Sequence, residues 1–314
     1  MTETVAALDC GSNSTRLLIA RGDDTLAREM RITRLSQGVD ATGALAPDAR
    51  ARSYDVLRLY RGLMDDWGVE RGRLVATSAV RDASNGTQFL DEAQRIVGVD
   101  AALLTGSDEA SLSYDGAMKG LDDDDRPTMI VDIGGGSTEL AVRLDGSLRS
   151  FSMQLGCVRV SERALGRGVV GPDADEAARA MIDQELERAW SVEPAFSTLH
   201  ANVRLVGLAG TVATLAQLDA GSSVYDRAAV HHRPLRRQTV EQWRDALSSE
   251  DPETRLARPG MVAGREDVLH AGLYILVAVM AKLGVDELLS SENDILDGIV
   301  ASLYDPDRAR PPLT

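Results

Sequence analysis

The sequence predicts an α/β fold built from two related domains. Apolar segments of strand length alternate with segments whose apolar residues recur at helical spacing, which is typical of α/β folds. The stretch Asp9–Leu17, Asp-Cys-Gly-Ser-Asn-Ser-Thr-Arg-Leu, aligns without gaps on Asp132–Leu140, Asp-Ile-Gly-Gly-Gly-Ser-Thr-Glu-Leu. The two copies lie too far apart for a solenoid repeat, so they indicate two domains that each carry one strand–loop–strand hairpin.

The first half of the chain alternates strands and helices. Pro47 and Gly68 bound a helix with one apolar face, and Ser107 is the expected N-cap of a later helix with two acids in its first turn. The apolar face of the earlier helix consists of Val56, Leu59, Tyr60, Leu63 and Trp67. The expected elements are three strands within 4–34, a helix at 47–68, a strand at 73–77, a loop at 78–86, a helix at 89–97, a strand at 100–104 and a helix at 106–118.

The second half repeats this order. An acidic linker at 122–127 divides the expected domains, 1–125 and 126–294, and a last helix at about 295–314 is expected to pack back on the first domain. The expected elements are three strands within 128–156, a helix at 173–190, a strand at 202–208, a turn at 209–211, and helices at 212–218, 268–283 and 295–304 around a strand at 287–290. The apolar side of the helix at 173–190 consists of Ala177, Met181, Ile182, Leu186 and Trp190. Residues 219–265 are polar and basic, and they give no clear element.

Composition excludes several classes of protein. A chain of 314 residues with 44% hydrophobic residues can form two aliphatic cores. An aromatic content of 4% leaves no face for stacking bases, and a net charge of −15 disfavours nucleic acid or an anionic membrane as partners. His270 and Lys282 interrupt the most apolar segment, which is therefore expected to be a core helix. With no signal peptide and with Cys10 and Cys157 as the two cysteines, we expect a reduced, cytoplasmic protein.

The two glycine-containing loops favour phosphate binding. Glycines let backbone N–H groups approach an anion, and an acid at the end of a strand is suited to Mg²⁺. Ordinary hairpin turns are the alternative explanation, and Asp9 would then only cap its own turn. Duplication of the loop favours phosphate contact. The residues of the two loops are Gly11, Ser12, Asn13 and Ser14 in the first copy and Gly134, Gly135, Gly136 and Ser137 in the second.

These motifs together resemble a known family. The two loops and Gly207-x-Ala-Gly-Thr211 resemble the phosphate loops of the actin, sugar-kinase and heat-shock-chaperone superfamily. Within it, the chain resembles the exopolyphosphatase and guanosine pentaphosphate phosphohydrolase family. The stretches that support this are Thr77–Asn85, Gly106–Ala110, Arg265–Val268 and Ser291–Gly298. The resemblance implies two ribonuclease-H-like, actin-like ATPase domains with mixed sheets and an interdomain cleft.

The closing motif departs from the usual family pattern. The family often has Ser-Asp-Gly-Gly-Leu-Arg-Glu-Gly where this chain has Ser-Glu-Asn-Asp-Ile-Leu-Asp-Gly at Ser291–Gly298. This resembles a short actinobacterial-type branch that lacks the C-terminal extension of longer members. We therefore expect a preference for short polyphosphate chains.

The resemblance also assigns roles to individual residues. Glu109 is expected to orient or deprotonate the attacking water, although an acid in the first turn of a helix is also favoured by the helix dipole. The resemblance assigns Asp132 and Glu139 to the metal or water site, and Asp9 is the further candidate metal ligand. Carboxylates of Glu109, Asp132 and Glu139 that face one another would be unfavourable without a cation. The metal is expected to be Mg²⁺, with Mn²⁺ as a substitute. The expected phosphate-binding residues are those of the two loops together with Arg16, Arg81, Gly210, Thr211 and Arg265.

The last acid of the second loop has an arginine as its counterpart. Arg16 stands where Glu139 stands in the other copy, so the first loop is expected to bind phosphate and the second to hold metal and water. The basic segment His231–Arg237 would guide a polyanion or form a solvated loop. Its two histidines have no obvious third ligand, and no zinc site is expected.

The expected function is Mg²⁺-dependent release of terminal orthophosphate from polyphosphate. Hydrolysis of guanosine pentaphosphate at its 5′ end is the close alternative. A non-hydrolytic alarmone- or nucleotide-binding regulator is a second one, and a kinase is disfavoured because no sugar-binding segment is recognisable. Family resemblance also implies a homodimer.

Overall fold

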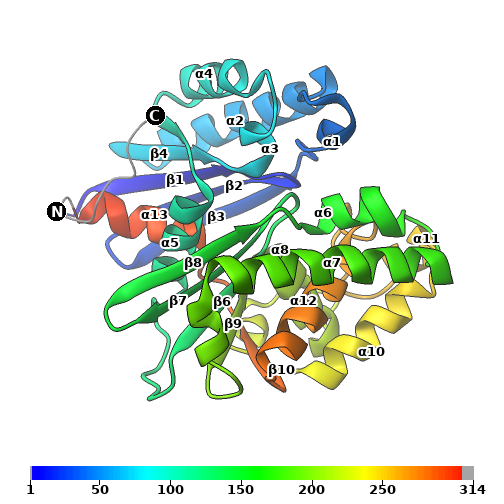
Figure 1. Ribbon diagram of the computed structural model, residues 1–314. Coiled ribbons are helices and arrows are strands. Elements are labelled where there is room, and N and C mark those ends of the chain that lie inside the picture. The colour runs from blue at the N-terminus through cyan, green and yellow to red at the C-terminus, as the bar shows by residue number, and fades with distance from the viewer. Residues whose placement is uncertain (1, 306–314) are drawn as a thin grey trace. The chain divides into compact units, whose positions relative to one another are not determined.

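The computed structural model describes residues 2–305 and divides into two compact units (Figure 1). The first unit contains the chain up to Lys119 together with the segment that begins at Ile295, and the second is Gly120–Asp294. The domain expectation placed the division a few residues later, after 125.

The first unit is built on a five-stranded mixed sheet in the order β3-β2-β1-β4-β5. Strand β1 pairs antiparallel with β2 and parallel with β4, and β2 and β3 are antiparallel. The strands are β1 (Thr4–Cys10), β2 (Ser14–Arg21), β3 (Asp24–Ile32), β4 (Arg71–Ala76) and β5 (Asp100–Leu103). The predicted three-strand start and the two later strands are therefore confirmed.

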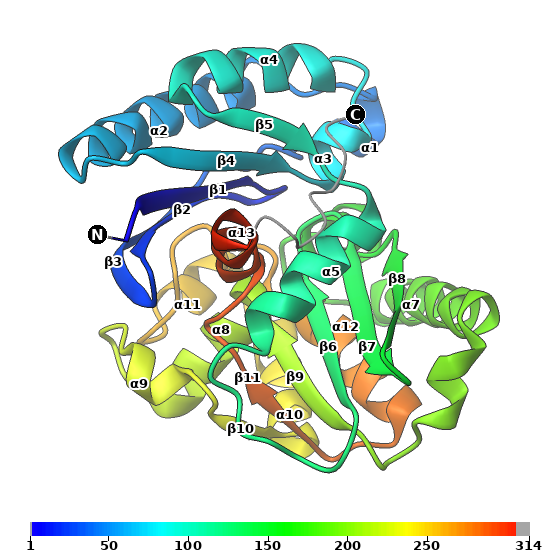
Figure 2. The same cartoon turned by 90° about the vertical axis from the view of Figure 1, so that its left-hand side faces the viewer.

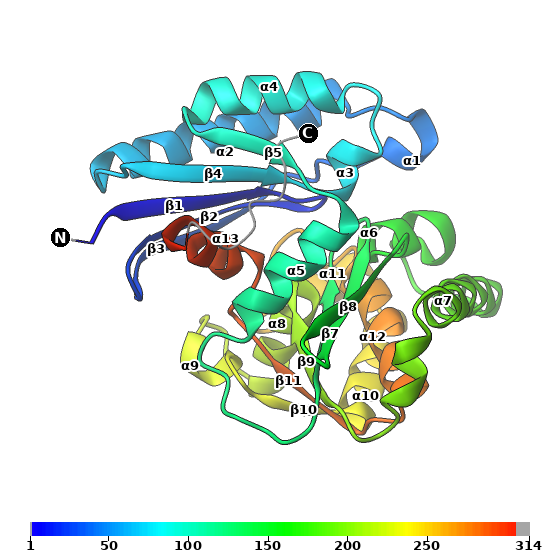
Figure 3. The ribbon, with the colours of Figure 1, turned by 60° about the vertical axis from the view of Figure 1, so that its left-hand side comes forward.

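Helices cover both faces of this sheet (Figure 2). Alternate residues of β1 point to opposite faces, so Ala6 and Leu8 enter one apolar cluster and Val5 and Ala7 the other. The first cluster is closed by α2 (Pro47–Asp66) and α4 (Gly86–Val97), and the second by α5 (Gly106–Ala117) and α13 (Ile295–Tyr304). Helix α13 also packs on α5 directly, as Figure 3 shows.

Predictions about three helical segments in the first unit were wrong in whole or in part. On the predicted apolar face of α2, Tyr60 is buried and Val56 and Leu63 pack against the apolar cluster, whereas Leu59 and Trp67 are 50% and 42% exposed. The other buried residues of α2 are Ala49, Ser53, Leu57 and Met64. Apolar residues lie on two sides of this helix, and the sequence does not show which side meets the sheet. The expected loop at 78–86 contains helix α3 (Ser78–Arg81), and α1 (Val39–Thr42) was not expected. The N-cap of α5 is Thr105 rather than Ser107, because Thr105 and Asp108 form a capping box.

The second unit is built on a six-stranded mixed sheet in the order β10-β11-β9-β6-β7-β8. The central strands β6, β9 and β11 are parallel, and β7, β8 and β10 are antiparallel to their neighbours. The strands are β6 (Thr128–Ile133), β7 (Thr138–Leu144), β8 (Ser147–Met153), β9 (Arg204–Leu208), β10 (Pro234–Arg236) and β11 (Glu287–Ser290). The α/β class with mixed sheets is thus confirmed in both units.

A single large apolar cluster joins this sheet to its helices. The helical segments are α6 (Cys157–Val160), which continues as a π-helical turn (Ser161–Leu165), α7 (Pro172–Val192), a 3₁₀ turn (Pro194–Thr198), α8 (Ala209–Ala220), α9 (Arg227–Val230), α10 (Arg237–Ser248), α11 (Pro252–Leu256) and α12 (Leu269–Leu283). The burial of Ile182 and Leu186 on α7 is confirmed, whereas Ala177 is exposed. Helix α8 already starts at Ala209, where a turn was expected.

Helix α12 is a core helix, as predicted. His270 is fully buried in it, and Lys282 lies in its last turn. Within residues 2–305, no helix has the length and apolar character needed to cross a membrane. Cys10 and Cys157 are both free and buried.

Candidate functional site

The two glycine loops have the same backbone geometry, one in each unit. In the first, the Gly11 N–H donates to the Ser14 carbonyl at 3.0 Å, and in the second, the Gly134 N–H donates to the Ser137 carbonyl at 3.0 Å. A Cβ atom on Gly11 or Gly134 would lie 3.1 or 3.2 Å from that same carbonyl oxygen. Glycine therefore permits the tight closure of both loops, and the sequence duplication has a structural counterpart.

The carbonyl groups of the first loop are bonded to the chain that follows β3. The Ser12 carbonyl accepts from the Ser36 N–H at 2.9 Å, and the Asn13 carbonyl accepts from the Thr33 and Arg34 N–H groups at 3.0 and 2.9 Å. In a trans peptide the C=O of one residue and the N–H of the next point in opposite directions. The N–H groups of Asn13 and Ser14 therefore point away from the segment 33–36.

The second loop is bonded in the same sense to helix α6. The Gly134 carbonyl accepts from the Cys157 N–H at 2.9 Å, and the Gly135 carbonyl accepts from the Val158 and Arg159 N–H groups at 2.9 and 3.1 Å. The Gly136 carbonyl accepts from Nε of Arg159 at 2.9 Å. By the same geometry, the N–H groups of Gly135, Gly136 and Ser137 point away from α6. Successive N–H groups on one side of a loop form an anion-binding site.

Gly156 allows α6 to lie directly on this loop. A Cβ atom there would be 2.3 Å from the carbonyl carbon and oxygen of Gly135 and 2.5 Å from the nitrogen of Gly136. No side chain fits in that space. Sequence reasoning missed Gly156, because a glycine between a strand and a helix is not by itself distinctive.

Asn13 offers a buried donor to the first loop. The residue is 6% exposed, and its side-chain Nδ2 has no hydrogen-bond partner within residues 2–305. Buried amide donors nearly always have an acceptor. A phosphate oxygen bound at this loop would supply one, so Asn13 fits its predicted role.

Asp9 and Arg16, which were predicted to bind metal and phosphate respectively, form an ion pair. They are Cα partners across β1 and β2, and the arginine donates to Oδ2 of Asp9 from Nε at 3.0 Å and from Nη2 at 2.7 Å. A guanidinium neutralises the carboxylate, which makes Asp9 a weaker candidate for a metal ligand than an acid that faces another acid.

Asp132 and Glu139 occupy the corresponding positions of the second hairpin. They are Cα partners across β6 and β7, and they are 7% and 1% exposed. Ser152, on the neighbouring strand β8, donates to Oε1 of Glu139 at 2.7 Å. Two buried carboxylates on directly opposite residues repel each other unless a cation lies between them, and their oxygens are the donors that Mg²⁺ prefers. Within residues 2–305, no group of three acidic, histidine or cysteine side chains with metal-binding geometry is present.

The catalytic candidate Glu109 lies in the first turn of α5. It is 9% exposed, and its Oε2 lies 3.5 Å from Nη1 of Arg81, which also donates to the Leu104 carbonyl at 2.7 Å. The capping box at Thr105 fixes the start of the helix and so the place of Glu109.

A hydroxyl pair connects the first loop to the helix that carries Arg81. The Ser12 and Ser78 hydroxyl oxygens are 3.0 Å apart, and Ser78 is the first residue of α3, with Arg81 as its last. The first unit therefore brings its glycine loop, Arg81 and Glu109 into one connected group. Ser78 was not predicted, although it lies inside the stretch Thr77–Asn85 that carries the family resemblance.

The second unit brings Gly210, Thr211 and Arg265 together. A Cβ atom on Gly210 would lie 1.8 Å from Nη2 of Arg265, so the guanidinium occupies the space that a side chain would need. Arg265 is 7% exposed. Helix α8 starts at Ala209, which has a positive φ of 64°. Non-glycine residues with a positive φ are uncommon and cluster at functional sites.

Strand register places this group beside the two carboxylates. Asp132 of β6 is the Cα partner of Leu208 of β9, and Ala209–Thr211 follow directly. Ligands of α/β sheets bind at the carboxyl ends of the strands. The second glycine loop, Asp132 and the start of α8 all lie at that end of the second sheet.

The basic segment His231–Arg237 does not form an uncompensated positive patch. Arg233 pairs with Asp219 and Arg237 with Asp286, each at 2.8 Å. The rings of His231 and His232 stack with centroids 3.8 Å apart, His231 accepts a bond from the Glu292 N–H, and burial lowers the pKa of His232. These contacts favour the structural alternative for this segment.

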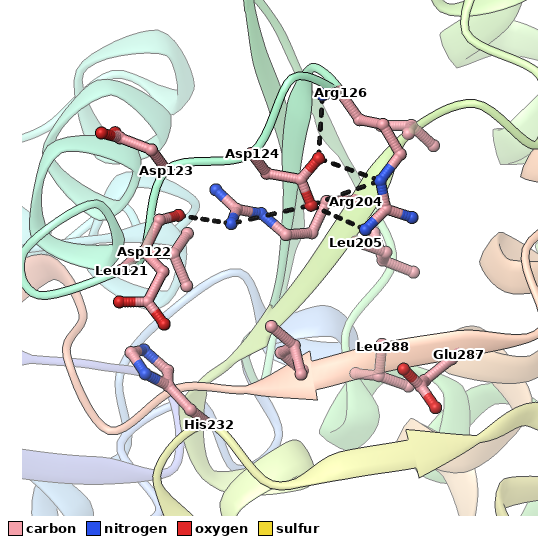
Figure 4. Close-up of a pocket in the computed structure, with 12 residues that line it drawn as sticks. Leu121, Asp122, Asp123, Asp124, Arg126, Arg204, Leu205, His232, Glu287 and Leu288 are labelled. Atoms are coloured by element: carbon pink, nitrogen blue, oxygen red, sulfur yellow. Dashed lines mark hydrogen bonds and ion pairs between the residues drawn. The ribbon is translucent and has the colours of Figure 1, made fainter.

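A pocket of about 380 Å³ lies in the second unit, away from the predicted site residues (Figure 4). Arg126 pairs with Asp124 at 2.7 Å, and Arg204 donates to the Asp122 carbonyl and to Thr128. The residues that line the pocket are Leu121, Asp122, Asp123, Asp124, Arg126, Val203, Arg204, Leu205, His232, Glu287, Leu288 and Leu289. None of the predicted catalytic, metal or phosphate-binding residues is among them.

Comparison with protein families identifies related sequences. A family model described as the Ppx/GppA phosphatase family matches residues 18–305. The chain is 38% identical to a protein named Exopolyphosphatase 2 from Mycobacterium tuberculosis, over 95% of this chain and 98% of that one. It is 28% identical to a guanosine-5′-triphosphate,3′-diphosphate pyrophosphatase from Vibrio campbellii, and the match spans 96% of this chain but 59% of that protein.

Solved structures show the same similarity. A crystal structure of an exopolyphosphatase-like protein is 33% identical to this chain, with a TM-score of 0.90 over 96% of this chain and 98% of the other. The Aquifex aeolicus member of the Ppx/GppA family is 28% identical, with a TM-score of 0.78 over 99% of this chain and 100% of the other. Both similarities extend over nearly the whole chain.

Proposed function

The chain belongs to the Ppx/GppA phosphatase family, and within it we propose an exopolyphosphatase that releases terminal orthophosphate from inorganic polyphosphate, with short chains favoured. The relative named Exopolyphosphatase 2 matches over nearly the full length of both chains, which supports this choice. A phosphoanhydride hydrolase needs donors for the phosphoryl oxygens, an oriented water and neutralisation of the leaving phosphate.

The geometry of the second loop is the observation that carries the proposal. Three successive N–H groups, those of Gly135, Gly136 and Ser137, point away from α6, since the loop carbonyls are bonded to that helix. The buried pair Asp132 and Glu139 flanks this loop. Anion donors beside paired carboxylates are what binding of a metal-complexed phosphate requires.

We propose that Asp132 and Glu139 hold Mg²⁺, for which Mn²⁺ can substitute. Burial and direct opposition of these two acids fit a divalent cation, whereas the ion pair with Arg16 makes Asp9 the weaker ligand. A divalent ion there neutralises charge on the phosphoryl oxygens.

Glu109 is proposed to orient or deprotonate the attacking water, and Nη1 of the neighbouring Arg81 lies 3.5 Å from its carboxylate. Asn13 and the N–H groups of the first loop bind phosphate oxygens. Gly210, Thr211 and Arg265 are the proposed phosphate contacts at the start of α8.

Phosphate release from tripolyphosphate with Mg²⁺ tests the proposed function. Replacing a general base lowers the rate by about 10²–10⁴-fold, so we expect that loss in Glu109→Ala and Glu109→Gln. Asp91→Asn, an exposed acid on α4, is the matched control and should retain the wild-type rate. Equal rates in wild type and Glu109→Gln would remove Glu109 from the mechanism.

Hydrolysis of guanosine pentaphosphate is the second candidate. The relatives that favour it are the Vibrio guanosine-5′-triphosphate,3′-diphosphate pyrophosphatases, of which the chain spans 59% to 62%. Low aromatic content argues mildly against a guanine-stacking site. Rates on tripolyphosphate and guanosine pentaphosphate in competition decide between the two substrates.

Three further points rest on the sequence and the family resemblance. They are a non-hydrolytic regulator as the alternative to the enzyme, a homodimer, and a cytoplasmic location. Tight binding of polyphosphate or guanosine pentaphosphate without phosphate release under any divalent metal would favour the regulator instead of the enzyme. The homodimer is tested by light scattering of the purified chain, and the cytoplasmic location by fractionation of cells that express it.

A further inference from the structure

The pocket in the second unit lies at the end of the sheet opposite to the second glycine loop. Its lining includes Arg204 and Glu287, the first residues of β9 and β11, and Arg126, two residues before β6. These are the amino ends of three parallel strands, whereas the glycine loop follows the carboxyl end of β6. The pocket volume of about 380 Å³ is within the range of small-molecule sites, about 300–1,000 Å³.

Part of this pocket is apolar. Val203, Leu205 and Leu288 belong to the large apolar cluster of the second unit, so the core fixes this part of the lining. Leu121 and Leu289 add two further aliphatic side chains. A ligand with a hydrocarbon body is stabilised by covering such side chains, because apolar surface is removed from water.

The polar part of the lining is acidic. It contains four acids and two arginines, an excess of two negative charges. Oδ2 of Asp124 lies 2.7 Å from Nη2 of Arg126 and 3.9 Å from Nη1 of Arg204, so this acid offsets charge on the arginines. The carboxylates of Asp122 and Glu287 make no hydrogen bond or ion pair with any residue that the structure describes.

These two carboxylates lie at different ends of the pocket. In Figure 4, the side chain of Asp122 points toward the ring of His232, and Glu287 lies on the opposite side, next to Leu288. Nε2 of His232 is buried and has no hydrogen-bond partner in the described part of the chain. Burial lowers the pKa of His232, so its ring is neutral at pH 7 and one ring nitrogen can accept a hydrogen bond.

An organic cation fits this lining better than a metal ion does. No three acidic, histidine or cysteine side chains of residues 2–305 have metal-binding geometry. An ammonium group carries three N–H donors and no acceptor, which suits a carboxylate beside an unpartnered imidazole nitrogen. Two carboxylates at two ends of a partly apolar pocket therefore call for two ammonium groups joined by a short hydrocarbon chain.

We propose that this pocket binds a small aliphatic diamine, with one ammonium group at Asp122 and His232 and the other at Glu287. The methylene groups of the ligand cover the aliphatic side chains of the lining, and its two positive charges equal the excess negative charge of the lining. The inference is independent of the proposed function, because none of the predicted catalytic, metal or phosphate-binding residues lines the pocket.

Calorimetry with 1,4-diaminobutane tests the site. The buffer contains Mg²⁺, so that the diamine does not compete for the acid pair Asp132 and Glu139, and its ionic strength is held constant. We expect one site per chain. A charge-assisted hydrogen bond corresponds to about a tenfold to hundredfold change in affinity, so butylamine and 4-aminobutanoate, which each lack one ammonium group, should bind more weakly by that factor.

Asp122→Asn and Glu287→Gln should each weaken binding of the diamine by about tenfold or more, because each removes the charge at one end of the pocket. Asp183→Asn is the matched control, since Asp183 is an exposed acid of α7 in the same unit. It should bind the diamine like wild type, and all three variants should keep the wild-type melting temperature.

Several results would overturn the inference. Butylamine that binds as tightly as the diamine would show that the second ammonium group has no partner. An equal loss of affinity in Asp183→Asn would show attraction to an acidic protein without a defined site. Affinities of Asp122→Asn and Glu287→Gln within twofold of wild type would place the diamine elsewhere, and tighter binding of 4-aminobutanoate would assign the pocket to zwitterions.

Discussion

Asp132 and Glu139 are direct Cα partners on adjacent antiparallel strands, at the positions where the first hairpin pairs Asp9 with Arg16. The first hairpin therefore neutralises its acid internally, with Arg16 bonded to Asp9 at 2.7 Å. The second hairpin places two buried acids together. This difference between otherwise similar loops is the physical basis for placing the metal at the second loop.

Mg²⁺ is expected to stabilise the wild-type chain and not the Asp132→Asn variant. A ligand that binds the folded state at a hundred times its dissociation constant stabilises it by about 2.7 kcal/mol. Melting curves with and without Mg²⁺ measure this effect. The control Asp9→Asn should keep most of the stabilisation, and an equal Mg²⁺ effect in wild type and Asp132→Asn would exclude Asp132 as a ligand.

Gly156→Ala is expected to destabilise the second unit and to lower phosphate release. Its Cβ atom would meet the Gly135 carbonyl at 2.3 Å, and overpacking of this kind costs about 1–3 kcal/mol. Gly62→Ala is the matched control: Gly62 lies within α2 with open space around its Cα, and alanine there should be neutral or stabilising by up to about 1 kcal/mol. Denaturant unfolding measures both, and the contact at Gly156 would be disproved by two equally stable variants.

Asn13→Ala is expected to weaken substrate binding without lowering stability. The side-chain Nδ2 is buried and lacks an acceptor within residues 2–305, so its removal breaks no hydrogen bond of the substrate-free chain. Loss of a bond to a charged phosphate oxygen should raise KM by about tenfold or more. Steady-state kinetics on tripolyphosphate and a melting curve test the two halves of this prediction. A lower melting temperature with unchanged KM would show that Asn13 is purely structural.

His270 is expected to make stability depend on pH below neutrality. Burial and the neighbouring Arg255 lower the pKa of His270 to about 3 from 6.5, and Arg255 Nη1 lies 3.3 Å from Nδ1 of the ring. Below pH 6.5 the unfolded chain binds a proton that the folded chain does not, so stability is complete above pH 6.5 and falls as the pH decreases toward 3. This amounts to about 2 kcal/mol between pH 7 and pH 5.

Unfolding free energies at pH 7 and pH 5 for wild type and His270→Gln check this sign. Glutamine keeps a hydrogen-bonding group but does not titrate, so its stability should change less over the same interval. A wild-type chain whose stability rises from pH 7 to pH 5, or a variant with the same pH dependence, would refute the assignment.

The elements that depend on local sequence were predictable. Apolar runs and glycines located both loops and every strand of residues 2–305 except β10, which lies in the polar and basic segment 219–265. Strand alternation and tight turns are encoded by neighbouring residues. The opposition of Asp132 and Glu139 also follows from the hairpin, because a closed loop between the strands fixes the register. Register reasoning would likewise have predicted the ion pair of Asp9 with Arg16.

Contacts between distant segments could not be predicted from the sequence. Ser78 reaches Ser12 and Arg159 reaches Gly136 only after the chain has folded. The buried side of α2 was predicted only in part for the same reason, because apolar residues lie on two sides of that helix and the sheet selects one. Ser78 and Arg159 carry no local sequence signal that distinguishes them from ordinary surface serines and arginines.

A titration of Mg²⁺ against phosphate release from tripolyphosphate, in wild type and Glu139→Gln, tests the central claim most directly. We predict that wild type releases orthophosphate only with the metal, and that Glu139→Gln needs at least about ten times more Mg²⁺ for half its maximal rate, or shows no release. Identical titration curves for the two proteins, or a wild-type chain that releases no phosphate at any Mg²⁺ concentration, would contradict the account.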